Sequence, residues 1–188
     1  MDFKVISEKL KYDSFLKIKE GTIEMIDSGK RHNRERVDRP DASVVLIRNI
    51  DQNTIVLVEQ FRYPTGKKIL EAMAGKVDKG ESPLDAAIRE TREECGYKVK
   101  PKNIKHLHSS FSTPGYSSEK FHLFYAEVTN SDKLKNEGGG LDDENEYINV
   151  VELPVEVFKE KVDNLELEDT KTLLLGMFLK SNHFSSLL

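Results

Sequence analysis

The sequence predicts an α/β protein in which a mixed sheet follows an N-terminal antiparallel β segment. Three observations lead to this prediction: short strand-like runs separated by turns at the start, two β-branched runs around a polar turn in the centre, and a strongly capped helix after them. At 188 residues the chain is long enough to bury one sizeable core.

The charge and the apolar runs of the sequence argue against some classes of binding partner. The formal net charge of -4 gives no electrostatic reason to expect binding to nucleic acid or to an anionic membrane. The longest apolar runs, VVLI and LLLGMF, are far shorter than the roughly 20 residues that a membrane-spanning helix needs. The single cysteine, Cys95, cannot form an intramolecular disulfide, and the start MDFKVISEKLKY carries charges where a signal peptide is apolar. We therefore expect a soluble, cytoplasmic protein.

Residues 1–40 are predicted to form an N-terminal β subdomain, because FKVIS, FLKIKEGTIEMI and RERV read as strands separated by turns. Residues 41–188 are predicted to form the main domain. There, SVVLIRNI and TIVLVEQFRY flank the polar turn Asp51-Gln52-Asn53, which predicts a hairpin. KKILEAMAG reads as one short strand that ends in glycine.

Further elements follow in order. HLHSSFS, KFHLFYAEV and YINVVEL are predicted to be strands, and the glycines and acidic residues of KLKNEGGGLDDENE favour a loop. Two helices are predicted near the end, at PVEVFKEKVDN and LEDTKTLLLGMFLK.

The clearest helix signals surround RETREECG. Ser82 is a good N-cap, Pro83 suits the first helical position, Asp85 lies in the first turn, and Gly96 is placed to end the helix. At about 100° per residue, Glu90, Glu93 and Glu94 share one sector roughly 100° wide. The apolar stripe is predicted on another side, comprising Leu84, Ala87, Ile88, Thr91 and Cys95.

Three glutamates in one sector repel one another, and like charges at i,i+4 cost about 0.2–0.5 kcal/mol. Arg89 lies one turn before Glu93, close enough to pair with it at i,i+4 and fix its orientation. One interpretation of the glutamates is an ordinary solvated helix face. The other is a divalent cation site. Mg²⁺ prefers oxygen ligands and typically binds through a few carboxylates plus substrate phosphates.

The spacing of Gly75, five residues, Glu81, seven residues and then RETREECGY resembles the Nudix hydrolase box, G-x5-E-x7-REUxEExGU with U aliphatic. Thr91 and Tyr97 depart from it at positions that are usually aliphatic. The resemblance implies a Nudix α/β/α sandwich and a pyrophosphohydrolase.

Outside the box the chain resembles the ADP-ribose pyrophosphatase branch. LVEQFRY and ILEAMAG imply that Arg62 and Glu71 lie on the substrate side and that the Ala74 carbonyl binds metal. Pro114-Gly115 matches the position of a proline that marks this branch. GLDDENEYI is similar to the loop that supplies the catalytic glutamate.

By this resemblance Glu90 and Glu94 would be the principal ligands of Mg²⁺, or of Mn²⁺ in its place. Glu93 would be a ligand or would orient water, and Glu146 would complete the cluster. Glu144 would be the general base, although the choice between Glu144 and Glu146 stays open.

The resemblance also implies a homodimer in which the N-terminal β region helps to form the partner's substrate pocket, with Arg34 and Arg36 as diphosphate contacts. The expected substrate is ADP-ribose or a related nucleoside diphosphate sugar. The alternatives are hydrolysis of GDP-mannose or another nucleoside diphosphate derivative, and a catalytically inactive module that senses ADP-ribose.

Overall fold

The computed structural model describes residues 2–135, 138–139 and 147–181. The chain divides into two compact units. The first consists of Met1–Ala42 with Ser109–Phe121, and the second of Ser43–His108 with His122–Leu188.

The first unit is built on a three-stranded antiparallel sheet. Its strands, in the spatial order β1-β2-β3, are β1 (Phe3–Asp13), β2 (Lys17–Met25) and β3 (Arg31–Asp38). These three strands confirm the strands predicted for the start of the chain. Residues 109–121 join this unit through two backbone hydrogen bonds, from the Val37 N–H to the Tyr116 carbonyl (2.7 Å) and from the Ser118 N–H to the Val37 carbonyl (3.1 Å).

The second unit is built on a seven-stranded mixed sheet. Five strands follow the order β10-β5-β4-β9-β8, while β6 pairs with β5 and β7 pairs with β4. The strands are β4 (Ala42–Asn49), β5 (Thr54–Arg62), β6 (Lys67–Glu71), β7 (Met73–Lys76), β8 (Ile104–Phe111), β9 (Lys120–Val128) and β10 (Ile148–Pro154).

The predicted hairpin is the β4–β5 pair. Its register places Ile47 opposite Val56. The Asn49 side chain accepts hydrogen bonds from the N–H groups of Asp51 and Gln52, at 3.1 and 3.3 Å, which folds the turn back on itself. The prediction is therefore confirmed.

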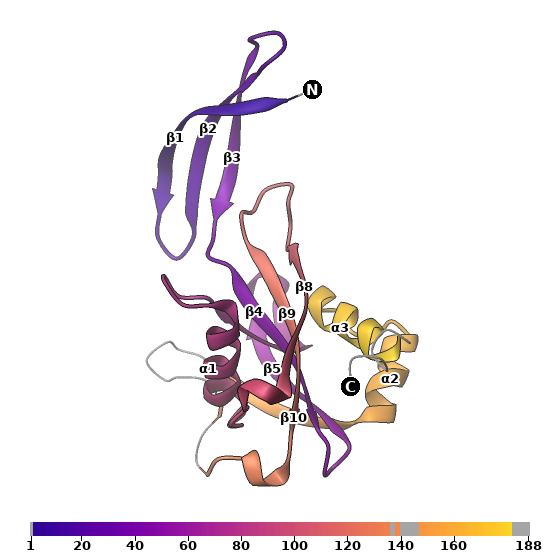
Figure 1. The fold of residues 1–188 in the computed structure, drawn as a ribbon. Coiled ribbons are helices and arrows are strands. Elements are labelled where there is room, and N and C mark those ends of the chain that lie inside the picture. Colours follow the sequence, from indigo (N-terminus) through magenta and orange to yellow (C-terminus); the bar gives the residue numbers. More distant parts are fainter. Residues whose placement is uncertain (1, 136–137, 140–146, 182–188) are drawn as a thin grey trace. The chain divides into compact units, whose positions relative to one another are not determined.

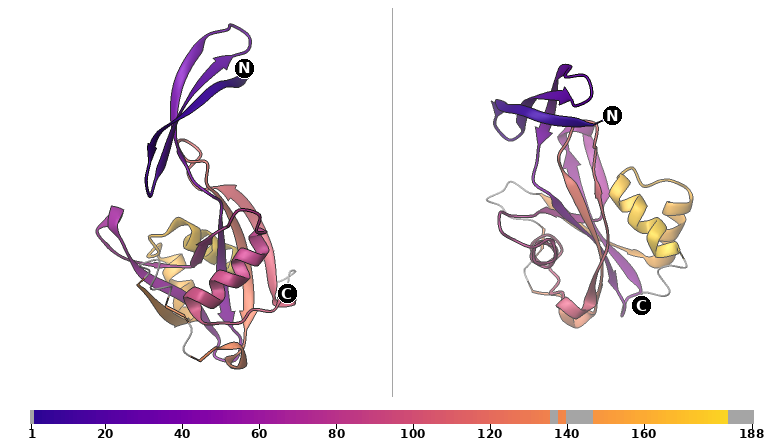
Figure 2. Two further views of the ribbon diagram at one scale, coloured as in Figure 1. Left: turned by 90° about the vertical axis from the view of Figure 1, so that its left-hand side faces the viewer. Right: turned by 45° about the horizontal axis from the view of Figure 1, so that its top comes forward.

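Helices cover both faces of this sheet (Figures 1 and 2). One face carries α1 (Pro83–Cys95), and the other carries α2 (Val155–Asp163) and α3 (Thr170–Lys180). Because neither face is open to water, the run VVLI of β4 is buried at every position instead of alternating. The α/β/α sandwich and both C-terminal helices are confirmed. Short 3₁₀ turns lie at Tyr63–Thr65, Pro101–Asn103 and Asn130–Asp132.

One predicted element is different. KKILEAMAG forms two strands, β6 and β7, which are separated at Ala72. The Ala72 N–H donates to the Thr172 hydroxyl of α3 at 2.6 Å, so a helix side chain satisfies the backbone at this break. Among the described residues, no helix combines the length and apolar character that crossing a membrane requires.

Candidate active site

Helix α1 forms as its end signals predict. The Ser82 side chain accepts a hydrogen bond from the Asp85 N–H at 3.1 Å, and Pro83 occupies the first helical position. Gly96 is left-handed, with φ of 69°, and its N–H donates to the Arg92 carbonyl at 3.0 Å. These caps fix where along the chain the glutamates are presented.

The buried face of α1 is not the one that apolarity alone predicts. Ala86, Ala87, Thr91, Glu94 and Cys95 are buried, whereas Leu84 is 36% exposed. The mean direction of these five residues is therefore rotated by about 55° from Leu84 toward Glu94, at about 100° per residue. The prediction was wrong for Leu84 because the face was chosen by hydrophobicity, while the helix in fact buries a carboxylate.

The two positions that depart from the aliphatic pattern are both fully buried. Thr91 donates its hydroxyl proton to the Ala87 carbonyl at 2.7 Å, one turn earlier in the helix. Tyr97 packs in the hydrophobic core and donates its hydroxyl proton to Glu152 at 2.8 Å. Each hydroxyl therefore has a partner, so the departures change packing without leaving a buried donor unsatisfied.

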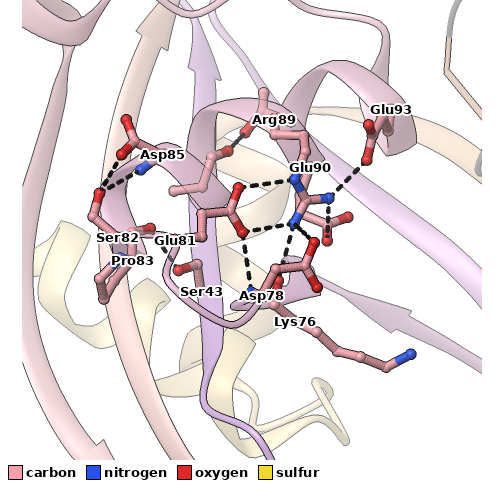
Figure 3. A network of polar contacts seen from close by, with 12 residues as sticks. Ser43, Lys76, Asp78, Glu81, Ser82, Pro83, Asp85, Arg89, Glu90 and Glu93 are labelled. Atoms are coloured by element: carbon pink, nitrogen blue, oxygen red, sulfur yellow. Dashed lines mark hydrogen bonds and ion pairs between the residues drawn. The ribbon is translucent and has the colours of Figure 1, made fainter.

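Arg89 gathers three carboxylates of the site (Figure 3). Its guanidinium donates to both oxygens of Glu81 at 3.0 Å, and one Nη donates to Glu90 at 2.8 Å and to Glu93 at 2.9 Å. It also reaches the Lys76 carbonyl at 3.1 Å. The hydrogen bond to Glu81 is the main cause of a raised Arg89 pKa, and Glu90 and Glu93 act in the same direction against burial. The predicted Arg89–Glu93 pair is confirmed.

Glu81 is a site residue to which sequence reasoning gave no role. It is a fixed position of the spacing pattern, which was the available signal, and its pKa is lowered chiefly by Arg89. Glu81 also accepts from the Asp78 N–H at 3.1 Å, so it ties the loop before α1 to the helix.

Gly75 allows the Glu90 carboxylate to lie against the backbone of β7. A β-carbon on Gly75 would overlap the carboxyl carbon of Glu90. Only glycine therefore permits this approach. Ala74 precedes Gly75 in the same strand, so the predicted ligands Ala74 and Glu90 lie near each other.

The donor set of this neighbourhood suits a hard divalent cation. Glu90, Glu93 and Glu94 offer carboxylate oxygens, and Ala74 offers a backbone carbonyl. Within the described part of the chain, no three His, Cys, Asp or Glu side chains are gathered into an ion-binding group. Glu90 and Glu93 are brought together at Arg89, and Glu94 is buried, with 3% exposure.

Arg62 and Glu71 form a second charged cluster. Arg62 donates from Nε and one Nη to the two oxygens of Glu71, at 2.6 and 2.8 Å. Glu71 also accepts from Lys171 of α3 at 2.5 Å. Burial opposes ionisation of Glu71, but the contacts with Arg62 and Lys171 outweigh it, so the pKa of Glu71 is lowered. Lys171 and its partner Asp169 were missed by sequence reasoning, since they lie about 100 residues away.

Four predicted substrate residues belong to the first unit. Arg34 is exposed, while Arg36 pairs with Glu8 at 3.2 Å and Asp38 at 3.0 Å. Pro114 and Gly115 form an exposed turn.

Glu144 and Glu146 lie outside the described residues. The segment that contains them is flanked by two hydrogen-bonded residues. The Gly139 N–H donates to the Glu94 carbonyl at 2.7 Å, and the Ile148 N–H donates to the Gly139 carbonyl at 3.2 Å. Gly139 therefore lies beside the last turn of α1, and Ile148 is bonded to Gly139.

Comparison with known proteins identifies a common family. Residues 38–172 match the model of the NUDIX domain. The chain is 35% identical over 155 residues to the ADP-ribose pyrophosphatase of Bacillus subtilis (strain 168), covering 82% of this chain and 80% of that protein. It is also 35% identical over 159 residues to the GDP-mannose pyrophosphatase of Escherichia coli (strain K12), covering 81% and 80%.

Two further likenesses extend this result. A methanol dehydrogenase activator of Bacillus methanolicus is 34% identical over 155 residues, covering 82% of this chain and 80% of that protein. A solved structure titled as an ADP compounds hydrolase superposes with a TM-score of 0.72, at 22% identity, covering 96% of this chain and 95% of that chain. At that identity the likeness concerns the fold.

Proposed function

Because this chain belongs to the NUDIX family of pyrophosphohydrolases, we propose that it hydrolyses the diphosphate bond of ADP-ribose or a closely related nucleoside diphosphate sugar. The products are a nucleoside monophosphate and a sugar phosphate. The observation that carries the proposal is the carboxylate-rich face of α1 beside the glycine of β7, in a protein similar to two nucleoside diphosphate sugar pyrophosphatases.

Hydrolases of this family generally use a divalent metal ion, and we propose Mg²⁺, with Mn²⁺ able to replace it. The carboxylates of Glu90, Glu93 and Glu94 and the carbonyl of Ala74 would hold it. When bound, such a cation neutralises phosphate charge and makes a water molecule more acidic. Arg89 holds Glu90 and Glu93 in place, so two of the proposed ligands are oriented before an ion arrives.

Arg62 is proposed to bind the anionic substrate. Its side chain is 40% exposed while Glu71 fixes it by two hydrogen bonds. A guanidinium has five N–H donors, so a fixed Arg62 retains donors for a diphosphate. Arg34, Arg36 and the Pro114-Gly115 turn are proposed as further substrate contacts.

A glutamate is proposed to remove the proton from the attacking water. Glu144 is the first candidate and Glu146 the second, since both lie in sequence between Gly139, which donates to the Glu94 carbonyl, and Ile148, which donates to the Gly139 carbonyl. A carboxylate acting as general base needs to come within hydrogen-bond reach of that water. Glu144→Gln and Glu146→Gln distinguish them, because loss of the base lowers kcat while metal binding persists, whereas loss of Glu146 as the proposed further metal ligand weakens metal binding.

The N-terminal β unit is proposed to form a homodimer. Large apolar side chains on β1 and around it are exposed, namely Phe3, Val5, Ile6, Leu10, Tyr12, Phe15, Leu16 and Ile26. Exposed apolar groups at this density are typical of interaction surfaces. A second copy that covers them would bring its own Arg34 and Arg36 to the assembly.

GDP-mannose is the second candidate substrate, because the relatives at 35% identity include pyrophosphatases of both compounds. The test is a substrate panel. ADP-ribose, GDP-mannose and other nucleoside diphosphate sugars are compared by kcat/KM with Mg²⁺, and products are identified by chromatography. Preference for ADP-ribose supports the proposal, whereas negligible turnover of ADP-ribose beside rapid turnover of another compound contradicts it. Binding of ADP-ribose without turnover of any compound would indicate a sensor.

A further inference from the structure

We propose that Lys171 is a positioning residue for substrate binding: it holds Glu71 and, through Glu71, orients the Arg62 guanidinium. The inference rests on the proposed role of Arg62 in binding a nucleoside diphosphate sugar. Lys171 lies at the start of α3, about 100 residues from Glu71 in sequence.

The charges form a linear chain of contacts. Asp169 accepts from the Lys171 ammonium at 2.8 Å, Lys171 donates to Glu71 at 2.5 Å, and Glu71 accepts two hydrogen bonds from Arg62. Glu71 and Lys171 are buried, with 3% and 9% exposure. The two negative charges of Asp169 and Glu71 balance the two positive charges of Lys171 and Arg62. Within this chain of contacts, removing Lys171 would leave Arg62 as the cation that pairs with the buried Glu71.

The first turn of α3 fixes the position of Lys171. Asp169 is the N-cap and accepts from the Thr172 N–H at 3.0 Å, while also pairing with Lys171. The Thr172 hydroxyl accepts from the Ala72 N–H, the residue directly after Glu71. The first turn of α3 therefore contacts two consecutive residues, Glu71 and Ala72, at the β6–β7 connection. These contacts restrict the movement of the Glu71 carboxylate.

Arg62 is the part of this chain that can meet a ligand. Glu71 takes two of its five N–H donors. A guanidinium bound in this bidentate way is held in one plane, and a long arginine without such a partner must lose rotamer freedom when it binds. Lys171 thereby prepares Arg62 for an anion without touching the ligand itself.

The same elements provide a matched control. Lys67 of β6 pairs with Glu168, just before α3, at 2.5 Å, and both side chains are more than half exposed. This pair joins the same two segments by the same chemistry, but at the surface. If Lys171 merely tied α3 to the sheet, loss of the Lys67 pair would have a similar effect.

The experiment has two readouts on purified full-length protein. The first is the ¹⁵N–¹H NMR signal of the Arg62 Nε, assigned by its loss in Arg62→Lys, which reports the orientation of Arg62 without any ligand. The second is ADP-ribose affinity by calorimetry in EDTA, where metal-dependent turnover is prevented. The variants are Lys171→Met, Lys171→Arg as the conservative rescue, and Lys67→Met as the control.

Lys171→Met is expected to broaden or shift the Arg62 signal and to weaken ADP-ribose binding by about tenfold or more, the effect of losing a charge-assisted hydrogen bond. Lys171→Arg and Lys67→Met are expected to behave like wild type. If Lys171→Met does not fold, Lys171→Gln takes its place in the same comparison.

The inference is overturned if the neutral variant keeps the wild-type Arg62 signal, or if it loses the signal and binds ADP-ribose as wild type does. Failure of the proposed function looks different. Wild type would then bind no nucleoside diphosphate sugar, and the Arg62 signal would still decide whether Lys171 positions Arg62.

Discussion

A glycine and a glutamate, Gly75 and Glu90, set the geometry of the site at the scale of single residues. The Glu90 carboxylate occupies the space that any side chain at position 75 would need. This contact therefore fixes the position of the Glu90 carboxylate of α1 relative to the backbone of β7. Arg89 also pairs with the same carboxylate, so Glu90 is placed by a contact and by an ion pair.

We predict that Gly75→Ala lowers activity far more than stability. The new methyl group displaces the end of a flexible Glu90 side chain, which costs the fold little but moves a proposed metal ligand. The kcat should fall about 100-fold, the range seen when a catalytic geometry is displaced by about 1 Å. Gly21→Ala is the control, because its β-carbon would meet Glu8 at an ordinary 3.6 Å. Equal kcat in Gly75→Ala and wild type would contradict the placement of Glu90.

Glu71 predicts a pH dependence of stability. Its pKa is lowered below the ordinary 4.5, so the folded state gains stability from its ionised form above about pH 4.5 and loses that gain as the pH falls through the folded pKa. Glu71→Gln should lower the free energy of unfolding by about 3 kcal/mol at pH 7. The difference from wild type should shrink below pH 4. Urea titrations at pH 7, 5 and 3.5 measure it.

Glu168→Gln is the control for this titration, since it removes an exposed pair worth about 1 kcal/mol or less. A Glu71→Gln effect that stays constant from pH 7 to pH 3.5 would show that ionised Glu71 is not what stabilises the cluster.

Residue patterns gave the identity of the α1 glutamates but not their burial. The spacing of Glu90, Glu93 and Glu94 was readable, and so was the Arg89–Glu93 pair. The burial of Glu94 could not be predicted. A buried helix face is predicted from its apolar residues, and a buried functional carboxylate is an exception to that rule. Glu71 and its partners Arg62 and Lys171 come from three different elements, so no local pattern could have joined all of them.

At the scale of elements, α1 is defined by its two ends, and its C-terminal end also organises the chain that follows. Gly138 packs on the backbone of Cys95 and Gly96, and Gly139 donates to the Glu94 carbonyl. These contacts hold Gly138 and Gly139, which precede residues 140–146 in sequence, at the turn of α1 that carries Glu94.

We predict that Gly138→Ala lowers turnover by displacing this segment. Gly138 has φ of +97°, and a β-carbon there would lie 2.9 Å from the Cys95 and Gly96 backbone atoms, which cannot move as a side chain can. Gly29→Ala is the matched control, because Gly29 also has a positive φ, of +67°, but faces open space. Gly29→Ala should cost about 1 kcal/mol in urea denaturation from its positive φ alone, and Gly138→Ala should cost more because of the added backbone clash. A similar kcat in the two variants would contradict the proposed role of the segment.

Strong local signals explain which elements could be predicted. The caps of α1 and the β4–β5 turn lie within a few residues of the structures they determine, and both were found. The break between β6 and β7 was missed, because the group that satisfies Ala72 is Thr172 of α3. A long-range side-chain contact of this kind leaves no trace in a local pattern.

At the scale of the whole molecule, the first unit exposes a group of large apolar side chains, which is typical of a surface that binds another protein chain. A three-stranded sheet normally needs a covered hydrophobic face to be stable. The proposed homodimer would provide that cover. The sandwich of the second unit was predictable from periodicity and family resemblance, whereas the state of assembly depends on surfaces that pair only between chains.

We predict that Val5→Asp weakens the dimer. Light scattering coupled to size exclusion should give twice the 21.5 kDa chain mass for wild type and a shift toward one chain mass for the variant. The buried aspartate would lack a partner in an apolar interface, which is costly. Val157→Asp on α2 is the control, since Val157 is exposed in the second unit. Wild type running as a monomer would contradict the dimer.

Hydrolysis of ADP-ribose by wild type and by Glu94→Gln tests the central claim most directly. We predict that wild type releases AMP and ribose 5-phosphate only when a divalent cation is present. Glu94→Gln, with an unchanged melting temperature, should be slower by about 100-fold or more, as expected when a preorganised charge of the site is removed. Glu156→Gln, an exposed change on α2, should keep the wild-type rate. Wild-type turnover by Glu94→Gln, with the cation still required, would contradict the account.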